Sequence, residues 1–384
     1  MITNIPKHWK IKKLGEIGVF FKGKGVPKNK ITDTGFKCLT YGDLYTKYDF
    51  VIEGVKSFID KETALISQEI RYGDICFAGS GETLEDIGKC ATFIDDEIGY
   101  AGGDIIVFRT EQNPIVMSYL LNSDIAKKQK FSMGQGHSVV HIYSSQLEML
   151  KLPLPPLEEQ EKIAEILLTC DKGIRLTTQI ITQLKQRNQG LAQQLLTGEK
   201  RVKGFEKSVW KEVRLGELLD YEQPTNYLVK NTDYSDEYKI PVLTAGKTFI
   251  LGYTNEKEGI CTNIPLILFD DFTTDSRYID FPFKVKSSAV KLLKAKKNVN
   301  LRFIFEAMKL IKYAIGGHER HWISKYAFLT IFVPSFKEQN AIAQILDTAH
   351  QELKLYEQKL QLLQAQKKTL MQKLLTGEVL TVKK

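Results

Sequence analysis

A long segment that occurs twice constrains the fold of this chain more than any other feature of the sequence. One copy occupies residues 155–199 and the other residues 334–378, and the two align without a gap at an offset of 179 residues. Both copies carry the dipeptide Glu-Gln near their start and end in LLTGE. A repeat of this length predicts a chain built from two copies of one structural unit.

Each copy predicts one long helix with a coiled-coil seam. Apolar residues recur in alternating steps of four and three, from Ile163 in the first copy and from Ile342 in the second, which is the heptad pattern. A proline precedes a charged first turn and Thr-Gly follows the last turn, as is typical of helix ends. Asn188 and Lys367 place a polar residue at the same seam position, where such a residue fixes register. Any long amphipathic helix shows part of this pattern, but the matched ends favour duplication.

A shorter repeat precedes each helix. Trp9 and Trp210 each begin the pattern Trp, four residues, Leu-Gly-Glu. The repeated unit is therefore one globular domain followed by one helix. We expect a first domain at 1–152, a first helical segment at 153–199, a second domain at 200–332 and a second helical segment at 333–384.

Short apolar runs between glycine-rich turns predict that each domain is a compact α/β unit. The expected strands are 74–79, 104–109, 264–272 and 280–287, and the expected helices are 113–130 and 300–314. A loop with glycine and histidine precedes each long helix. The predicted fold class is α+β, with two α/β domains separated by two long helices that pair as an antiparallel coiled coil in an internal pseudo-two-fold repeat.

Composition bounds the class of protein. Hydrophobic residues make up 43% and charged residues 26%, which is ordinary for a soluble globular protein. The formal net charge of +8 is compatible with a polyanionic partner. The five cysteines are never spaced as CxxC, which favours a reducing compartment. Without a signal peptide or an apolar run long enough to span a membrane, we expect a cytoplasmic protein without a membrane partner.

Motifs for catalysis are weak or absent. The fragments 21–25 and 77–81 have the F-x-G-x-G form of an S-adenosylmethionine loop, but neither has the strand, helix and acidic residue that such a loop needs. The Asn-Pro-Pro-aromatic motif of amino-methyltransferases and the phosphate-binding GxxxxGK[ST] are missing, and no ligand spacing links the six histidines. Asp270-Asp271 lacks the further acid and lysine of a nuclease. We therefore expect no catalytic residue, no metal site and no bound cofactor.

Contact with double-stranded DNA fits the basic stretches in both domains, because each neutralised phosphate adds affinity. The two loops before the helices supply side chains able to read bases, with glycines that allow close approach. Arg320 is the best candidate for a guanine contact, and Lys291 is expected to bind phosphate. The candidate base contacts in these loops are Gln135, His137, Ser138, His318, Arg320 and His321.

The repeated motifs resemble the specificity subunits of type I restriction-modification systems. The resemblance rests on LPLPPLEEQEKIAEIL and FVPSFKEQNAIAQIL, each leading to LLTG and each following the Trp, Leu-Gly-Glu opening. The segments 71–90 and 266–283 also resemble target-recognition patterns of this family, which adds Ser80, Thr83, Thr273 and Arg277 as candidate DNA contacts.

This resemblance implies two target recognition domains, each reading half of a split DNA site, and helices that dock two methyltransferase subunits and, through them, restriction subunits. S-adenosylmethionine would then be carried by the methyltransferase subunits. The helix length would act as a ruler for the spacer between the half-sites. The residues expected to serve docking or spacing are Glu159, Gln160, Ile163, Asn188, Glu338, Gln339, Ile342 and Lys367.

Two departures from the family pattern stand out. Ser335 and Phe336 occupy the places of Pro156 and Leu157, and Gly79 stands where the family usually has arginine. Two other function classes stay open at this point: a scaffold whose coiled coil joins partners other than DNA, and an enzyme hidden in the globular domains.

Overall fold

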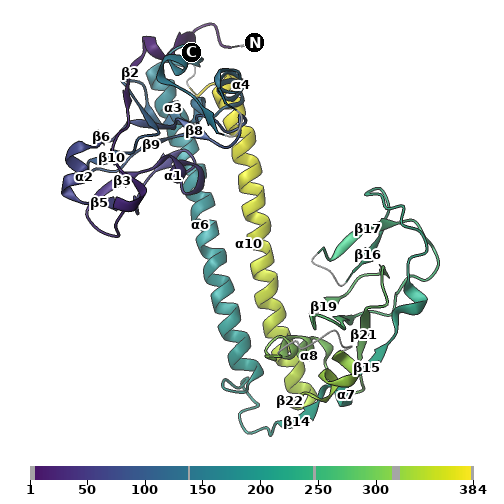
Figure 1. The fold of residues 1–384 in the computed structure, drawn as a ribbon. Helices are drawn as coiled ribbons and strands as arrows, with labels where there is room; N and C mark the ends of the chain where they lie inside the picture. The colour runs from purple at the N-terminus through teal and green to yellow at the C-terminus, as the bar shows by residue number, and fades with distance from the viewer. Residues whose placement is uncertain (1–4, 137–138, 245–247, 314–320, 382–384) are drawn as a thin grey trace. The chain divides into compact units, whose positions relative to one another are not determined.

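The two predicted helices are continuous in the computed structural model (Figure 1). Helix α6 runs from Leu157 to Leu196 and helix α10 from Phe336 to Thr376. The structure describes residues 5–136, 139–244, 248–313 and 321–381. Gly198 and Gly377 follow the helices with φ angles of 74° and 73°, a left-handed conformation that glycine adopts without a Cβ penalty and that commonly ends helices.

The chain divides into two units, and each combines one domain with parts of both long helices. The first unit contains residues 1–178 and 359–384, and the second contains residues 179–358. Within the second unit, Lys185 contacts Glu357, Arg187 contacts Glu352, and the Asn188 side chain donates to the carbonyl of Ala349. The partner number falls as the α6 number rises, so the helices pair antiparallel, as predicted.

The first domain consists of small sheets with helices between them. Strands β1 and β13 pair antiparallel, so the opening of the domain lies beside the strand that leads into α6. A five-stranded sheet has the order β2-β11-β7-β9-β4 and a four-stranded sheet the order β5-β3-β10-β6, while β8 pairs with β12. The strands are β1 (Lys10–Lys13), β2 (Gly18–Lys22), β3 (Phe36–Leu39), β4 (Val51–Ile52), β5 (Phe58–Ile59), β6 (Gln68–Ile70), β7 (Ile75–Ala78), β8 (Ser80–Gly81), β9 (Cys90–Phe93), β10 (Gly99–Ala101), β11 (Ile105–Thr110), β12 (Val140–His141) and β13 (Lys151–Leu154). The helices are η1 (Leu14–Glu16), η2 (Lys28–Lys30), α1 (Tyr41–Thr46), α2 (Lys61–Ile66), α3 (Pro114–Leu121), α4 (Asp124–Met133) and α5 (Ser144–Leu147).

The core of the first unit joins the domain to both long helices. Phe77 and Phe108 from the five-stranded sheet share one buried cluster with Ile163 of α6 and Leu374 of α10. The apolar seam predicted from the heptads therefore packs against the domain at this end of the helices as well as against its partner helix.

The single helix predicted at 113–130 is wrong, because two helices, α3 and α4, cover this stretch. The Asn122 side-chain amide donates to the carbonyl of Cys90 at 2.6 Å and to the carbonyl of Ser118 at 2.9 Å. The Ser123 hydroxyl donates to the carbonyl of Leu120 at 2.6 Å. These bonds occupy the end of α3 and let a second helix start after Ser123.

The second domain repeats this plan with fewer elements in its described ranges. Strands β14 and β22 pair antiparallel as β1 and β13 do. One sheet has the order β15-β21-β18-β19 and another the order β17-β16-β20. The strands are β14 (Lys211–Arg214), β15 (Leu219–Glu222), β16 (Ile240–Leu243), β17 (Ile250–Thr254), β18 (Leu266–Asp270), β19 (Ser276–Ile279), β20 (Lys284–Val285), β21 (Val290–Ala295) and β22 (Thr330–Val333). The helices are α7 (Leu215–Leu218), η3 (Pro224–Tyr227), α8 (Leu301–Met308), α9 (His321–Ser324) and η4 (Tyr326–Phe328).

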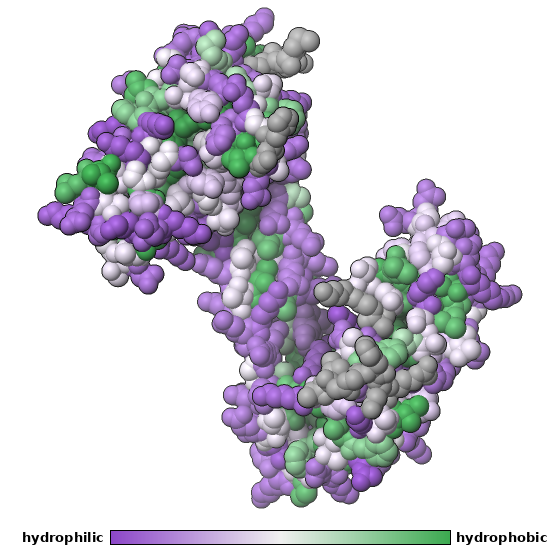
Figure 2. Space-filling model, viewed as in Figure 1, coloured by the Kyte–Doolittle hydropathy of each residue, from purple (hydrophilic) through white to green (hydrophobic). Residues whose placement is uncertain are grey.

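The surfaces of both domains carry mostly hydrophilic side chains in the view of Figure 2, with apolar residues in small groups between them. Among the described residues, no helix combines the length and the apolar character that crossing a membrane requires. The architecture is thus α+β, with two repeated domains. Each domain packs against parts of both long helices.

Candidate nucleic-acid interface

Three polar side chains form a row at one edge of the first domain. His141 in β12 pairs with Ser80 in β8, and a bridge pairs His141 with Gln135 on its other side. Directly opposite residues of neighbouring strands point to the same face. We call Gln135, His141 and Ser80 the polar row. The Ser80 hydroxyl lies 3.0 Å from Nδ1 of His141.

A small cavity of about 160 Å³ opens beside the polar row. Lys22, Gly79, Gly103 and Tyr143 contribute to its lining, together with Ser80 and His141. The Tyr143 ring lies nearly parallel to the His141 ring, with centroids 6.4 Å apart and an interplanar angle of 21°. The structure therefore brings two predicted residues, Gln135 and Ser80, to one place. Thr83 is exposed just beyond β8, whereas His137 and Ser138 lie outside the described residues.

In the second domain, Thr273 and Arg277 lie on the exposed turn and strand after β18. Asp270 shapes this turn, because its carboxylate accepts from the backbone of Phe272 at 2.9 Å and from the Thr273 hydroxyl at 2.6 Å. Arg277 contacts Asp275 at 3.1 Å and lies 5.6 Å from the centre of the Phe249 ring. Both predicted residues are accessible at this edge.

The prediction of a phosphate contact at Lys291 is wrong, because Lys291 is completely buried. Its Nζ lies 3.1 Å from Asp271 Oδ2 and 3.1 Å from Gln223 Oε1. Asp271 also accepts from the backbone of Trp322 at 2.8 Å and of His321 at 2.9 Å. His321, the first residue of α9, is likewise fully buried. This network therefore anchors α9 and encloses the His321 side chain. His318 and Arg320 lie outside the described residues.

The Glu-Gln dipeptide of the first repeat fastens the domain to α6. Glu159 accepts from the Trp9 indole at 2.9 Å and lies 2.5 Å from the His8 imidazole. The Gln160 side chain accepts from the backbone of Asn113 at 2.9 Å. Asn113 caps α3, so one helical turn of α6 holds both the opening of the domain and its main helix.

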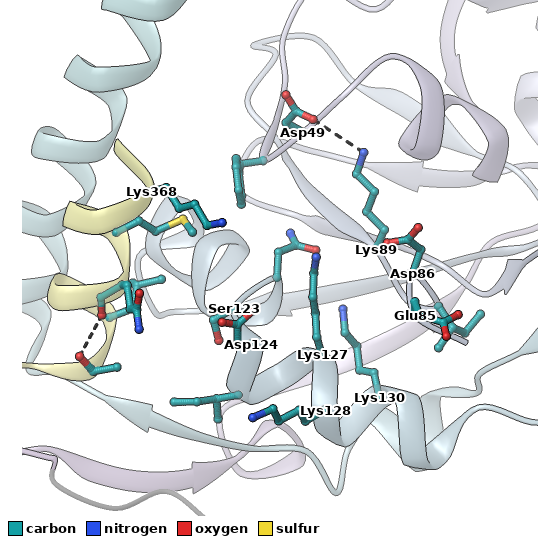
Figure 3. A pocket seen from close by; sticks show the side chains of 18 of the residues that line it. Asp49, Glu85, Asp86, Lys89, Ser123, Asp124, Lys127, Lys128, Lys130 and Lys368 are labelled. Atoms are coloured by element: carbon teal, nitrogen blue, oxygen red, sulfur yellow. Dashed lines mark hydrogen bonds and ion pairs between the residues drawn. The ribbon is translucent and has the colours of Figure 1, made fainter. Parts of the chain in front are cut away.

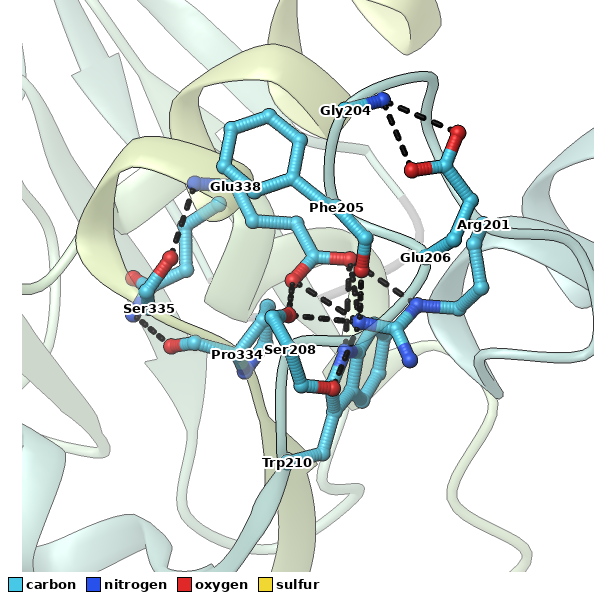
Figure 4. A network of polar contacts seen from close by, with 10 residues as sticks. Arg201, Gly204, Phe205, Glu206, Ser208, Trp210, Pro334, Ser335 and Glu338 are labelled. Atoms are coloured by element: carbon cyan, nitrogen blue, oxygen red, sulfur yellow. Dashed lines mark hydrogen bonds and ion pairs between the residues drawn. The ribbon is translucent and has the colours of Figure 1, made fainter.

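The second repeat makes the same attachment with a stronger set of partners (Figure 4). Buried Glu338 accepts from the Arg201 guanidinium at 3.0 Å and from the Trp210 indole at 3.3 Å, and the Ser208 hydroxyl also donates to it. Gln339 accepts from the backbone of Asn300 at 2.8 Å, and Asn300 caps α8.

The four Glu-Gln residues are thus buried contacts within each unit, which corrects the expectation that they dock another subunit. Ile163 and Ile342 are also buried in the unit cores. The departure at Ser335 has a local explanation, because its hydroxyl accepts from the backbone of Glu338 at 3.4 Å at the start of α10. This bond caps the helix where the first copy has proline.

The polar seam residues are partnered as well. Lys367 of α10 donates to Asp171 of α6, and the Tyr119 hydroxyl of α3 donates to the same carboxylate. The Lys367 ammonium lies 4.4 Å from the centre of the Phe50 ring. Burial, together with the bond to Asp171, raises the pKa of Tyr119 well above its ordinary value. In the second unit, the Asn188 side chain donates to the Ala349 carbonyl at 2.9 Å. Both residues serve helix pairing.

A cavity of about 790 Å³ in the first unit is lined by charges of both signs (Figure 3). Lys89, Lys127 and Lys368 project into it, with Asp49 and Asp124 among the acids. Lys130 also lines the cavity; burial lowers its pKa, and its Nζ donates to the Gly88 carbonyl at 2.6 Å. Across the described ranges, no group of three or more His, Cys, Asp or Glu could hold a metal ion.

Comparisons with known proteins agree with the repeated architecture. A family model described as the type I restriction modification DNA specificity domain matches residues 6–186 and 207–365. The Escherichia coli type I restriction enzyme EcoR124I/EcoR124II specificity subunit is 47% identical over 146 residues, which cover 35% of this chain and 36% of that protein. The putative MjaX specificity subunit of Methanocaldococcus jannaschii is 27% identical over 410 aligned positions, covering 98% of this chain and 95% of the relative.

Solved structures share the fold at low sequence identity. The S subunit of a type I restriction-modification system from M. genitalium superposes with a TM-score of 0.66 at 18% identity and covers 97% of both chains. The HsdS subunit from Thermoanaerobacter tengcongensis gives a TM-score of 0.51 at 18% identity and covers 98% of both chains.

Proposed function

This chain belongs to the family of type I restriction-modification specificity subunits, and from that membership we propose that it reads a bipartite site on double-stranded DNA. Each domain contacts one half of the site. Members of this family are specificity subunits, a non-catalytic class. The chain itself therefore catalyses neither methyl transfer nor DNA cleavage.

The observation that carries this proposal is the repeated attachment of each domain to the helices. In both units a tryptophan and a capped helix are held by Glu-Gln at the start of a long helix. Such bonds fix the domain on its helix, so that its reading edge has a defined orientation. In contrast, the edges themselves differ: the first unit presents the polar row, and the second presents Thr273 and Arg277. A fixed frame with different edges suits two different half-sites.

We further propose that two methyltransferase subunits, which carry S-adenosylmethionine, dock on the outer faces of the long helices, and that restriction subunits join through them. The Glu-Gln side chains already bond to residues of this chain, so other residues must contact the methyltransferase subunits. Leu168 and Leu176 on α6 and Leu355 and Leu362 on α10 are exposed. Exposed leucines on helices are suitable for burial against a protein partner.

The experiment is reconstitution of the full chain with methyltransferase subunits and S-adenosylmethionine, followed by sequencing of the methylated DNA. We expect methylation at one bipartite motif, and none by either component alone. Binding of the methyltransferase without any sequence preference would support a scaffold instead. Methylation by the isolated chain would contradict its non-catalytic role.

A further inference from the structure

The polar row has the geometry of a reader of base edges. We propose that His141 is a specificity-determining residue that donates from Nε2 to an acceptor on a base edge in the major groove, and that Ser80 is its positioning residue. The inference rests on the proposed DNA-reading function and names the contact that the first domain makes.

The backbone of His141 is held on both sides. Its N–H donates to the carbonyl of Gln135 at 2.8 Å, and its carbonyl accepts from the N–H of Gln135 at 3.0 Å. On the other side, β12 pairs with β8 so that His141 lies opposite Ser80. The next residue, Ile142, is buried and donates its N–H to the carbonyl of Gly79 at 2.9 Å. His141 therefore has a fixed backbone before any ligand arrives.

The hydrogen bond to Ser80 also selects the tautomer of the imidazole. Ser80 is 4% exposed, and within the described ranges its hydroxyl contacts only Nδ1 of His141. If Nδ1 carried the proton and donated, the buried hydroxyl proton would have no acceptor, which is costly. If the hydroxyl donates to Nδ1, the buried hydroxyl proton has its acceptor. The neutral ring then carries its proton on Nε2.

An outward N–H on His141 recognises acceptors. In the major groove these are N7 and O6 of guanine, N7 of adenine and O4 of thymine, whereas cytosine presents an amino donor there. Gln135 is exposed beside His141 and brings an amide that both donates and accepts. The row is therefore expected to disfavour cytosine at the position that His141 contacts.

The surroundings leave room for a base edge. A Cβ at Gly103 would meet no heavy atom within 4 Å, so this side of the cavity is open. The cavity of about 160 Å³ is the liquid volume of about five water molecules. A base edge that entered this cavity would meet the polar row. Lys22, exposed at the rim, supplies a charge for a neighbouring phosphate.

The second domain lacks this row among its described residues. There, the backbone of His321 donates to the carbonyl of Asp271 at 2.9 Å, in the same way that Ile142 donates to Gly79. The Asp271 carboxylate, however, is buried against Lys291. The contribution of His141 should consequently be confined to the half-site of the first domain.

The test uses the full chain reconstituted with methyltransferase subunits and a library randomised in both half-sites. His141→Ala should relax one position of one half-site by roughly tenfold or more and leave the other half-site unchanged. Ser80→Ala should relax the same position to a smaller extent, and the double variant should match His141→Ala. Thr34→Ala, at an exposed residue between η2 and β3, is the control. Thermal melting checks the fold of each variant.

An unchanged methylation motif in the His141→Ala complex would overturn the inference. A folded His141→Ala variant whose affinity falls by the same factor for all sequences would also overturn it, because the residue would then contact phosphate. Effects of Ser80→Ala and His141→Ala that simply add, or that fall on different positions, would remove the positioning role. A wild-type complex with no sequence preference would instead sink the proposed function itself.

Discussion

Replacing Glu338 by alanine should destabilise the second unit more than the equivalent Glu159→Ala destabilises the first. Glu338 is fully buried and receives the Arg201 guanidinium at 2.9 Å. Arg201 is itself only 22% exposed, so the variant strands a largely buried cation that keeps only neutral acceptors on Phe205 and Ser208, beside the unpaired Trp210 indole. Removing one partner of a buried pair costs about 3–5 kcal/mol.

The first unit lacks that cation. Glu159 receives the Trp9 indole and contacts His8, and no arginine is bonded to it among the described residues. Glu159→Ala should therefore cost about 1–3 kcal/mol, the range for leaving buried hydrogen-bonding groups unmade. The two carboxylates occupy equivalent positions of the repeat, so the difference between them isolates the effect of the guanidinium.

Hydrogen exchange measures this comparison, because it reports the opening of each unit separately. Amides of α8 and of the start of α10 should lose protection in Glu338→Ala, and the melting temperature should fall on the order of 10 °C. The double variant Glu338→Ala/Arg201→Met should recover part of the loss, since it removes the stranded cation. If Glu338→Ala costs no more than Glu159→Ala, the argument from the buried cation fails.

Further predictions concern the long helices. Burial lowers the pKa of His350 below its ordinary value of 6.5, so the unfolded state binds the proton more readily than the folded state does. The contribution of neutral His350 to stability, present above pH 6.5, should therefore be lost as the pH falls below 6.5. Urea unfolding measured across this range should show a flatter pH dependence in His350→Gln. Lys367→Met should lower the free energy of unfolding by about 1–3 kcal/mol, because it removes a charged hydrogen bond to Asp171. Denaturation of this variant, of Asp171→Asn and of the double variant measures the coupling between the two side chains. Fully additive losses would contradict that coupling. Inserting seven residues after Gln179 and seven after Gln358 preserves the heptad phase and lengthens each helix by about 10 Å. The preferred DNA spacer should then grow by about three base pairs at roughly 3.4 Å each. Competition between sites that differ only in spacer length measures this preference. An unchanged preference would show that the length of the helices does not set the spacer.

Local periodicity predicted the parts of the fold that depend on neighbouring residues. The heptads from Ile163 and Ile342 gave both long helices, because each residue of a helix surface packs with residues three and four positions away. The break after Asn122 was missed because its side chain bonds to Cys90, a strand residue far away in sequence. A pattern read along 113–130 contains no sign of that partner.

The candidate site was predicted in part for a similar reason. Ser80 and Gln135 came from two separate segments, and only strand pairing shows that His141 lies between them. The signal that could have identified His141 was the apolar pair Val139-Val140 before it, which resembles a strand more than a loop tip. Lys291 was assigned to the surface because a basic stretch usually is solvated, while its buried partner Asp271 lies in the turn after β18.

The attachment of Gly377 has a consequence for the way the chain is closed. A Cβ at Gly377 would lie 2.3 Å from the Pro6 ring, and a Cβ at Gly198 would lie 3.7 Å from the Trp210 indole. In the second unit, the end of α6 continues covalently into the domain that it touches; in the first unit, the end of α10 reaches its domain without a peptide bond. Each unit therefore holds the end of one long helix against its domain, through the continuous chain in the second unit and through packing alone in the first. Circular permutation that links residues 1 and 384 and opens the chain between Gly198 and Arg201, before the residues that bond to Glu338, should preserve both units.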